Sequence, residues 1–298
     1  MIARNLLIGA AVAAALPTAA VAQDAPPAEA VSAPAPSDAP NAMADFGRDT
    51  ITLGLGLAYL PDYEGSNDYR FAPGPAAIGT IGGISFSVLG SRASADLIPS
   101  PGGPSWDIQL GPVAAINFMR SNRQSIEDAR VRRLGERDTS IELGGYAGIG
   151  KTGVITSQYD KLSVSVSYRH DVSGVHRSGI WQPTINYFTP LSEKSALALF
   201  ASAERVETKY VQTYFYVPAG QSAISGLPTY TTGRGGWKNW TVGALGTYSL
   251  TGNLLRGFKL VAGGTYRRMI NDVADSPLVR IAGSRTQWLG AVGVAYTF

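Results

Sequence analysis

The sequence contains no cysteine and only two histidines among its 298 residues. Without cysteine, a disulfide framework, a thiolate metal site and a cysteine nucleophile are all excluded. Long hydrophobic runs are also missing, because no window after residue 22 reaches the about 18 apolar residues of a membrane-spanning helix. The net charge is only +3, which argues against nucleic-acid binding. Only six of the 25 basic residues are lysines, and arginine prefers phosphate and carboxylate partners.

The first 48 residues have the composition of a targeting segment followed by a linker. Arg4 precedes an apolar run over 6–16, and the small triplet Ala-Val-Ala follows at 20–22. This order predicts a signal peptide over residues 1–22, and therefore export. Residues 23–48 consist mostly of Ala, Pro, Ser, Asp and Glu, which predicts a flexible periplasmic tether without a core of its own.

The remaining chain, residues 49–298, alternates apolar and polar residues with a period of two. In the stretch TITLGLGLAY (50–59), every second residue is Ile, Leu or Tyr, and Thr, Gly or Ala stand between them. This period indicates strands with one apolar face. Twelve strands are predicted, with ten as the alternative because the second to fourth are interrupted by Gly and Pro. Their predicted positions are 50–59, 73–81, 83–90, 92–98, 105–118, 139–149, 160–171, 179–190, 195–206, 239–250, 258–268 and 285–298.

The length and the ends of these strands decide the fold class. Strands of about ten residues with an apolar outer face and aromatic ends are typical of transmembrane barrels. In lipid every strand edge has to be paired, so the sheet must close on itself. The sequence thus predicts an all-β antiparallel barrel over 49–298 in the outer membrane of a Gram-negative bacterium. The longer connections, near residues 60, 119, 172, 207 and 269, are expected to face outward, and the shorter ones the periplasm.

The last strand, TQWLGAVGVAYTF, places Val294, Tyr296 and Phe298 on one face. An aromatic residue at the end of an alternating strand resembles the signal read by the bacterial outer-membrane assembly machinery. We therefore expect that machinery to be a partner of this chain.

Four stretches resemble the MipA/OmpV family of outer-membrane proteins, named for a protein that interacts with the murein transglycosylase MltA. They are GLGLAYLPDYEGSNDYRFAPGP (54–75), YFYVPAGQSAISGLPTY (214–230), NDVADSPLVRIAGSRTQ (271–287) and GVAYTF (293–298). Within them, the family-motif positions are Pro61, Tyr63, Gly65, Ser225, Gly226, Leu227, Asp275, Ser276, Pro277, Leu278 and Val279.

The resemblance implies a non-enzymatic barrel that scaffolds peptidoglycan-remodelling enzymes, with a murein transglycosylase and a penicillin-binding protein as partners. It supplies no catalytic residues, and no cofactor is expected. A diffusion channel for small solutes is the alternative, because the inward strand faces are rich in small and polar residues. Whether the lumen is open, and whether the segment 207–238 folds into it or stands above it, stays undecided by sequence.

A lipase is a minor alternative, since an outer-membrane phospholipase is also a barrel of this size with a His–Ser pair at its rim. By parity His170 lies on the lipid face near the outer rim, with Ser173 and Ser178 nearby, and His176 lies in the following loop. Triad chemistry needs an oriented base with a specific partner, and no such pair stands out in the sequence. A polar histidine at the membrane interface is the favoured interpretation.

Two loops carry candidate binding residues. The stretch PDYEGSNDYR (61–70) has three acids that could ligate calcium, but their order does not match a calcium loop. A polar turn whose carboxylates meet water or arginines is favoured. The loop 120–138 carries six arginines that could clamp lipopolysaccharide phosphates, or could pair within the loop. These are Arg120, Arg123, Arg130, Arg132, Arg133 and Arg137.

Overall fold

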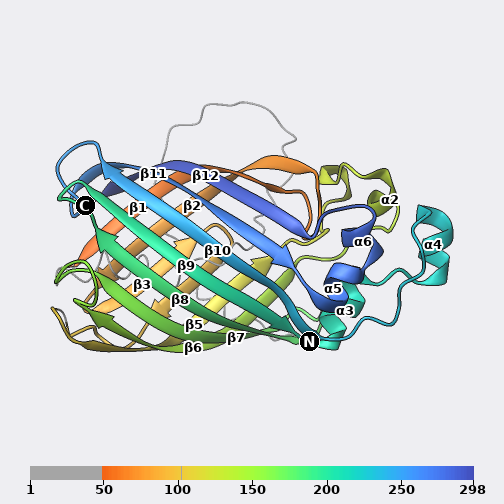
Figure 1. The fold of residues 1–298 in the computed structure, drawn as a ribbon, viewed down its shortest axis with the longest axis horizontal. Helices are drawn as coiled ribbons and strands as arrows, with labels where there is room; N and C mark the ends of the chain where they lie inside the picture. The colour runs from red at the N-terminus through yellow and green to blue at the C-terminus, as the bar shows by residue number, and fades with distance from the viewer. Residues whose placement is uncertain (1–48, 102) are drawn as a thin grey trace, which may run out of the picture.

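The computed structural model of the protein describes residues 49–101 and 103–298. Antiparallel strands form one closed barrel, in which each strand pairs with the next and β1 pairs with β12 (Figure 1). The predicted signal peptide (1–22) and tether (23–48) lie outside the described residues. The strands are β1 (Thr50–Pro61), β2 (Tyr69–Ile81), β3 (Ile84–Leu89), β4 (Arg92–Asp96), β5 (Trp106–Asn117), β6 (Ser140–Thr152), β7 (Lys161–Asp171), β8 (Gly179–Pro190), β9 (Ser195–Val206), β10 (Gly236–Ser249), β11 (Gly257–Met269) and β12 (Thr286–Thr297).

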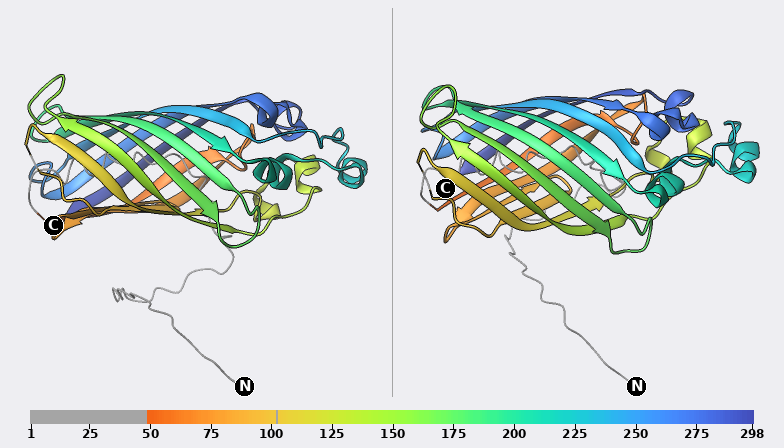
Figure 2. Two further views of the ribbon diagram at one scale, coloured as in Figure 1. Left: turned by 90° about the horizontal axis from the view of Figure 1, so that it is seen from below. Right: turned by 60° about the horizontal axis from the view of Figure 1, so that its bottom comes forward.

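The two ends of the barrel differ. The long connections and the helices lie at one end, which we call the cap end, and short turns close the other, the turn end (Figures 1 and 2). The helical segments are η1 (Arg123–Ser125), α2 (Ala129–Arg132), α3 (Thr208–Phe215), α4 (Ala219–Ser225), α5 (Asn271–Asp275) and α6 (Pro277–Arg280). In the described part of the chain, no helix is both long and apolar enough to cross a bilayer.

The prediction of twelve strands is confirmed, and the ten-strand alternative is wrong. The largest difference in bounds is at β2, which begins at Tyr69 rather than at residue 73. The prolines at 73 and 75 look like a break in the sequence but lie inside the strand. The N–H of Gly90 donates to the carbonyl of Pro75, so the backbone of Pro75 faces β3. In a strand, the backbone groups of residues two apart point to the same neighbouring strand, so those of Pro73 also point away from β1. The missing N–H groups of the two prolines therefore remove no hydrogen bond between β2 and β1.

The barrel wall has a step at its cap end, beside β2. The strands β3 and β4 have only six and five residues. Because β3 pairs with β2 only from Ala76 to Ile81, the Tyr69–Gly74 half of β2 pairs, among the described strands, with β1 alone. We call this the β2 step. Its edge carries Pro73, and Pro75 lies where the contact with the β3–β4 turn begins.

Alternation along each strand sorts apolar side chains to the outside and polar ones to the inside. In β5, Trp106, Ile108 and Leu110 are exposed on the outer surface, while Asp107 and Gln109 between them are buried inside. An outer surface of Leu, Ile and Val with a polar interior is the arrangement that a bilayer requires. The barrel is therefore a transmembrane barrel, as the period of two predicts.

Aromatic side chains mark both rims of this apolar surface. At the cap end, rings from neighbouring strands contact each other: Tyr59 stacks on Tyr69 and Tyr168 packs at a tilt against Trp181, with centroids 5.1 and 4.7 Å apart. Aromatic rings settle at the interface between hydrocarbon and headgroups, so the two belts fix the depth of the barrel in the membrane. The cap-end belt comprises Tyr59, Tyr69, Phe71, Tyr168, Trp181, Trp240, Tyr266 and Trp288; the turn-end belt comprises Trp106, Tyr248, Phe258, Tyr296 and Phe298.

Candidate functional site

The connections at the cap end pack into one body, which we call the cap. Its first hydrophobic cluster joins α3 and α5 to the strand ends, and its second joins the remaining loops. The first cluster contains Met119, Ile180, Val206, Tyr210, Val211, Tyr214, Phe215, Met269, Val273, Ala274 and Val279. The second contains Tyr63, Ile126, Val131, Leu134, Val217, Leu227, Leu278 and Ala282. These loops thus have a core of their own, which holds them over the barrel mouth.

The segment 207–235 divides between the mouth and the outside. In α3 the residues Tyr210, Val211, Tyr214 and Phe215 are all buried, and they follow helical spacing. In α4, by contrast, Ile224 is 64% exposed, and the helix extends away from the barrel (Figure 1). The question that the sequence left undecided is therefore answered in two parts: α3 fills the mouth and α4 stands above it.

The stretch 61–70 lies inside the cap and holds it together. Tyr63 is fully buried, and its hydroxyl donates to the carbonyls of Leu278 and Ala282 at 3.0 and 2.9 Å. Gly65 has a φ of 99°, and a Cβ there would meet the Val279 side chain at 2.6 Å, so only glycine fits. Residues more than 200 positions apart in the chain are thereby joined.

The other family-motif positions also make contacts within the cap. The Ser276 hydroxyl donates to the Phe215 carbonyl at 2.7 Å, which ties α6 to α3. Ser225 accepts from the N–H of Leu227 at 3.2 Å, and Gly226 ends α4 in the left-handed conformation. At the surface, Asp275 forms an exposed ion pair with Arg285. The motif residues of three separate loops, with Pro61, Pro277, Leu278 and Val279 also buried, thus converge in the cap.

The expectation that the carboxylates of this stretch meet water or arginines is wrong for Asp62 and confirmed for Glu64, which lies 3.5 Å from Arg267. Asp62 is 1% exposed and accepts the N–H of Glu127 at 2.7 Å, and burial raises the pKa of its carboxyl. Glu64 is also buried but points into the barrel, so these two carboxylates do not share one site. Over residues 49–101 and 103–298, no group of three or more His, Asp or Glu side chains is arranged to hold a metal ion.

Below the cap, charged side chains from several strands form a buried network. Lys238 lies 2.9 Å from both Glu64 and Glu204, and Arg267 lies 3.5 Å from Glu64. Arg169 extends the network, at 2.7 Å from Glu204. Because paired charges in a buried site stabilise one another only with good geometry, the short contacts indicate a rigid arrangement. Arg169 also contacts Glu142 at 2.7 Å.

A β-bulge explains how Lys238 reaches this network. The register between β9 and β10 shifts between Trp237 and Asn239, and both Lys238 and Asn239 turn inward. The Asn239 amide then donates to Glu64 and Glu204, both at 3.2 Å. A strict period of two would place one of these two neighbours in lipid, so strand periodicity alone misses this part of the site.

Tyr210 connects the cap to the network. Its hydroxyl donates to Glu64 at 3.1 Å and accepts from Lys238 at 3.2 Å. The Lys238 ammonium also lies 4.7 Å from the centroid of the Tyr210 ring. Burial, together with the negative charge of Glu64, raises the pKa of the Tyr210 phenol, which therefore remains a hydrogen-bond donor. The cap is thus tied to the barrel interior by α3.

The two histidines take different places. His170 is on the outer face, as parity predicts, with its ring 3.4 Å from the Tyr168 hydroxyl. His176 lies under α3, with its Nδ1 2.7 Å from the Ser178 hydroxyl and its Nε2 3.5 Å from Glu142. This pair has the residue types of a nucleophile and its base, but Ser178 is fully buried. No substrate reaches it while the cap is in place.

The six arginines of the loop 120–138 do not form one surface. Arg120 is fully enclosed and donates to the carbonyls of Tyr214 and Gly135, so it cannot reach lipopolysaccharide, and the expectation for that residue is wrong. Burial lowers the pKa of Arg120 to about 9. Arg137 likewise donates to the Thr213 carbonyl in the cap.

The remaining four arginines lie further out. Arg130 pairs with Asp128 at 2.6 Å, and Arg132 donates to the Glu127 carbonyl. Arg123 and Arg133 are exposed. A lipopolysaccharide contact therefore stays a prediction for these two and for the partly exposed pair.

At the turn end, one carboxylate organises the connection between β6 and β7. Asp160 accepts the N–H groups of Val154, Ile155 and Thr156 at 2.7–2.8 Å, and the Tyr187 hydroxyl at 2.8 Å. Burial opposes ionisation, but these donors outweigh it and lower the pKa of Asp160 to about 2. The turn is therefore held in one conformation by the charged form of a single residue.

Asp160→Asn is expected to destabilise the barrel by about 1–2 kcal/mol at pH 7, because the amide accepts fewer of these hydrogen bonds. Because the pKa of Asp160 is lower in the folded protein than in the unfolded chain, the ionised carboxylate stabilises the fold. This stabilisation is complete at pH values above the unfolded pKa, near 3.8, and is lost as the pH falls through the folded pKa of about 2. Urea unfolding of both proteins in detergent micelles at pH 7, 4 and 2 measures the effect. A difference that is unchanged at pH 2 would contradict this role for the carboxylate.

The apolar outer surface, the aromatic belts and the closed sheet define a transmembrane β-barrel whose mouth is filled by its own chain. The chain belongs to the MipA family, because the family model described as MltA-interacting protein MipA matches residues 53–298. The resemblance seen in the sequence is thereby confirmed. A comparison with curated proteins finds no match.

Solved structures with the same general form include outer-membrane channels. The COG4313 outer membrane channel from Pseudomonas putida F1 shares 12% identity at a TM-score of 0.41, over 84% of this chain and 95% of that one. The outer membrane channel DcaP of Acinetobacter baumannii shares 6% identity at a TM-score of 0.36, over 84% of this chain and 96% of that one. A Pseudomonas aeruginosa FadL homologue shares 10% identity at a TM-score of 0.31, over 87% of this chain and 93% of that one. At such identities and scores, no function is transferred from these proteins.

Proposed function

We propose that this protein is a non-enzymatic barrel of the Gram-negative outer membrane that binds a murein transglycosylase at its turn end. The observation that supports this most is the cap, which fills the mouth with buried side chains and leaves the turn end as the accessible face. The family description names an MltA-type transglycosylase as the partner, and such enzymes act on peptidoglycan in the periplasm. In this orientation the turn end faces the periplasm and the cap faces outward.

The turn between β6 and β7 is the best candidate contact. Ile155 is 68% exposed at its tip, although the backbone beneath it is fixed by Asp160. Leu191 and Leu250, in neighbouring turns, are 64% and 53% exposed. A rigid turn with an apolar tip loses little conformational entropy on binding, which favours a specific protein contact.

Two exposed isoleucines at opposite ends allow a matched test. Ile155→Asp is expected to weaken binding of the purified barrel to a soluble MltA-type transglycosylase roughly tenfold or more, since buried apolar anchors dominate interface energies. Ile224→Asp, in α4 of the cap, serves as the control, because Ile224 is similarly exposed at 64%. Biolayer interferometry in detergent gives both dissociation constants. Loss of binding in the Ile224 variant alone, or no binding by the unaltered barrel, would overturn the proposal.

A diffusion channel is the second candidate, and one observation favours it. The inner wall formed by β1 and β12 carries small residues, because Gly54, Gly56 and Ala58 pair with Ala295, Gly293 and Ala291. The strands of the bulky ionic network are β6, β7, β9, β10 and β11, and Glu64 joins them from the loop after β1. Space along the small-residue wall could conduct solutes if the cap moved, so the two candidates differ in whether the cap opens.

A further inference from the structure

Among the residues that the structure describes, no carboxylate contacts Arg92, an arginine inside the barrel. Arg92, at the start of β4, is only 8% exposed. Its guanidinium donates to the Gln182 side-chain oxygen at 2.6 Å and to the Ser167 hydroxyl at 3.3 Å. Among the described ion pairs none includes Arg92, although a buried charge is costly unless it is paired.

The same amide oxygen serves a second guanidinium. The Gln182 oxygen also accepts from Arg169 at 2.7 Å, so two positive groups share one neutral acceptor. Arg169 is compensated, because Glu142 and Glu204 each lie 2.7 Å away. Arg92 makes no such contact: Glu142 and Glu204 favour its charge only from a distance, and the like charge of Arg169 disfavours it.

The described charges linked to Arg92 include more cations than carboxylates. Among the described residues, Gln182 and the ion pairs link four lysine and arginine side chains to three carboxylates. The excess is located at Arg92, since every other cation contacts a carboxylate. The four cations are Arg92, Arg169, Lys238 and Arg267, and the three carboxylates are Glu64, Glu142 and Glu204.

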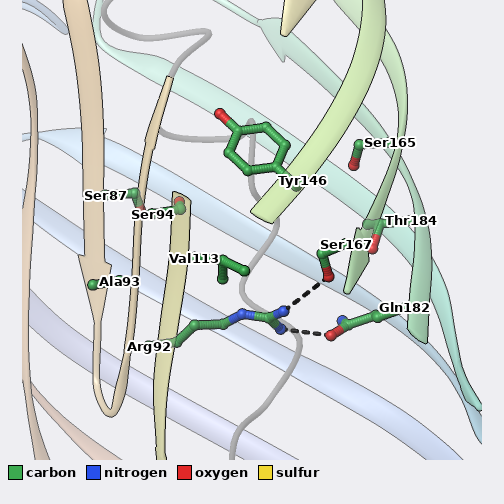
Figure 3. A pocket seen from close by; sticks show the side chains of 10 residues that line it. All are labelled: Ser87, Arg92, Ala93, Ser94, Val113, Tyr146, Ser165, Ser167, Gln182 and Thr184. Atoms are coloured by element: carbon green, nitrogen blue, oxygen red, sulfur yellow. Dashed lines mark hydrogen bonds between the residues drawn. The ribbon is translucent and has the colours of Figure 1, made fainter. Parts of the chain in front are cut away.

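A cavity lies beside this guanidinium. It has a volume of about 20 Å³, enough for roughly one water-sized occupant. Figure 3 shows Arg92 directed across it toward Ser167 and Gln182, with further hydroxyl groups around it. The lining comprises Ser87, Arg92, Ala93, Ser94, Val113, Tyr146, Ser165, Ser167, Gln182 and Thr184. Hydroxyl groups can rotate to donate, and no carboxylate lines the space.

From this juxtaposition of a buried guanidinium that contacts only neutral groups, a ring of hydroxyl groups and a cavity of ionic size, we propose that the barrel binds a small monovalent anion, such as chloride, against Arg92. The anion neutralises the excess charge and accepts hydrogen bonds from the guanidinium and the hydroxyls.

Bromide is the probe for the first test, because its anomalous scattering locates it in a crystal of the full chain soaked in sodium bromide. We expect an anomalous peak in the cavity, within hydrogen-bond distance of Arg92, and no peak there in Arg92→Gln. An ordered water without anomalous signal in the unaltered protein would overturn the proposal. So would a carboxylate of the chain itself, from residues 1–48, occupying the position.

Urea unfolding provides a second test in solution. At constant ionic strength, the unfolding midpoint should rise when sodium gluconate is replaced by sodium chloride, because binding to the folded state stabilises it. In Arg92→Gln the dissociation constant for chloride should rise roughly tenfold or more, because a charge-assisted hydrogen bond to the anion is lost.

Arg133→Gln, at an exposed position of the cap, is the matched control and should keep the full chloride response. The same response in both variants would overturn the proposal. Should Arg92→Gln fail to fold, the bromide map of the unaltered protein decides alone.

Discussion

Replacing residues 208–234 by a short Gly-Ser linker is expected to turn a silent barrel into a conducting one. The deleted segment includes α3, whose Tyr210, Tyr214 and Phe215 are buried in the mouth. A barrel of this strand number is wide enough to keep an aqueous path when side chains do not fill it. We expect mean conductance in planar bilayers to rise by roughly tenfold or more, with discrete steps.

The control for this experiment is removal of α4 alone, over 219–225. Because α4 stands away from the barrel and Ile224 is exposed, its loss should leave the mouth closed (Figure 1). Equal conductance after both deletions would show that α3 is not the barrier. A silent barrel after the larger deletion would show that the network below the cap closes the lumen by itself, and would remove the channel candidate.

Glu204→Gln is expected to destabilise the barrel by about 3–5 kcal/mol, because removing one partner of a buried ion pair leaves the others uncompensated. Glu204 lies 2.7 Å from Arg169 and 2.9 Å from Lys238, and it accepts from Asn239 as well. The substitution keeps the shape of the side chain but removes the charge between two cations. Urea unfolding in micelles, followed by tryptophan fluorescence, measures the loss.

Two further variants make the measurement specific. Glu193→Gln, in an exposed turn, should change stability by less than about 0.5 kcal/mol. Adding Lys238→Met to the Glu204 variant should recover part of the loss, because one unpaired cation is then also gone. An equal effect of Glu204→Gln and Glu193→Gln would show that the network contributes no stability.

The strands could be predicted because lipid imposes a direct pattern on the sequence. Over residues 50–59 of β1, each outward residue is Ile, Leu or Tyr and each inward one is Thr, Gly or Ala, so the period of two is readable without any contact information. The start of β2 was predicted four residues too late, because the effect of a proline on a strand depends on which neighbouring strand its missing N–H would face. That orientation follows from the pairing partner, not from the residue itself.

The site could be predicted only in part. Glu64 and Lys238 are 174 positions apart, and in the sequence each is simply a polar residue. The bulge that turns Lys238 inward leaves no local signature in the surrounding residues. One signal was available for the cap, since Tyr210, Val211, Tyr214 and Phe215 recur at helical spacing within an otherwise strand-like chain. Arginine content, by contrast, could not distinguish the enclosed Arg120 from the exposed Arg133.

The β2 step has a consequence for how copies of the protein meet in a crowded membrane. An uncovered strand edge normally recruits a strand from a neighbouring chain and merges two sheets into one. Along this edge Pro73 supplies no N–H, and Pro75 at its inner end supplies none either, so a strand from another copy would lack two of the backbone donors that it needs for pairing. Copies of the barrel can therefore touch at the step without exchanging or sharing strands, and each remains a separate sheet.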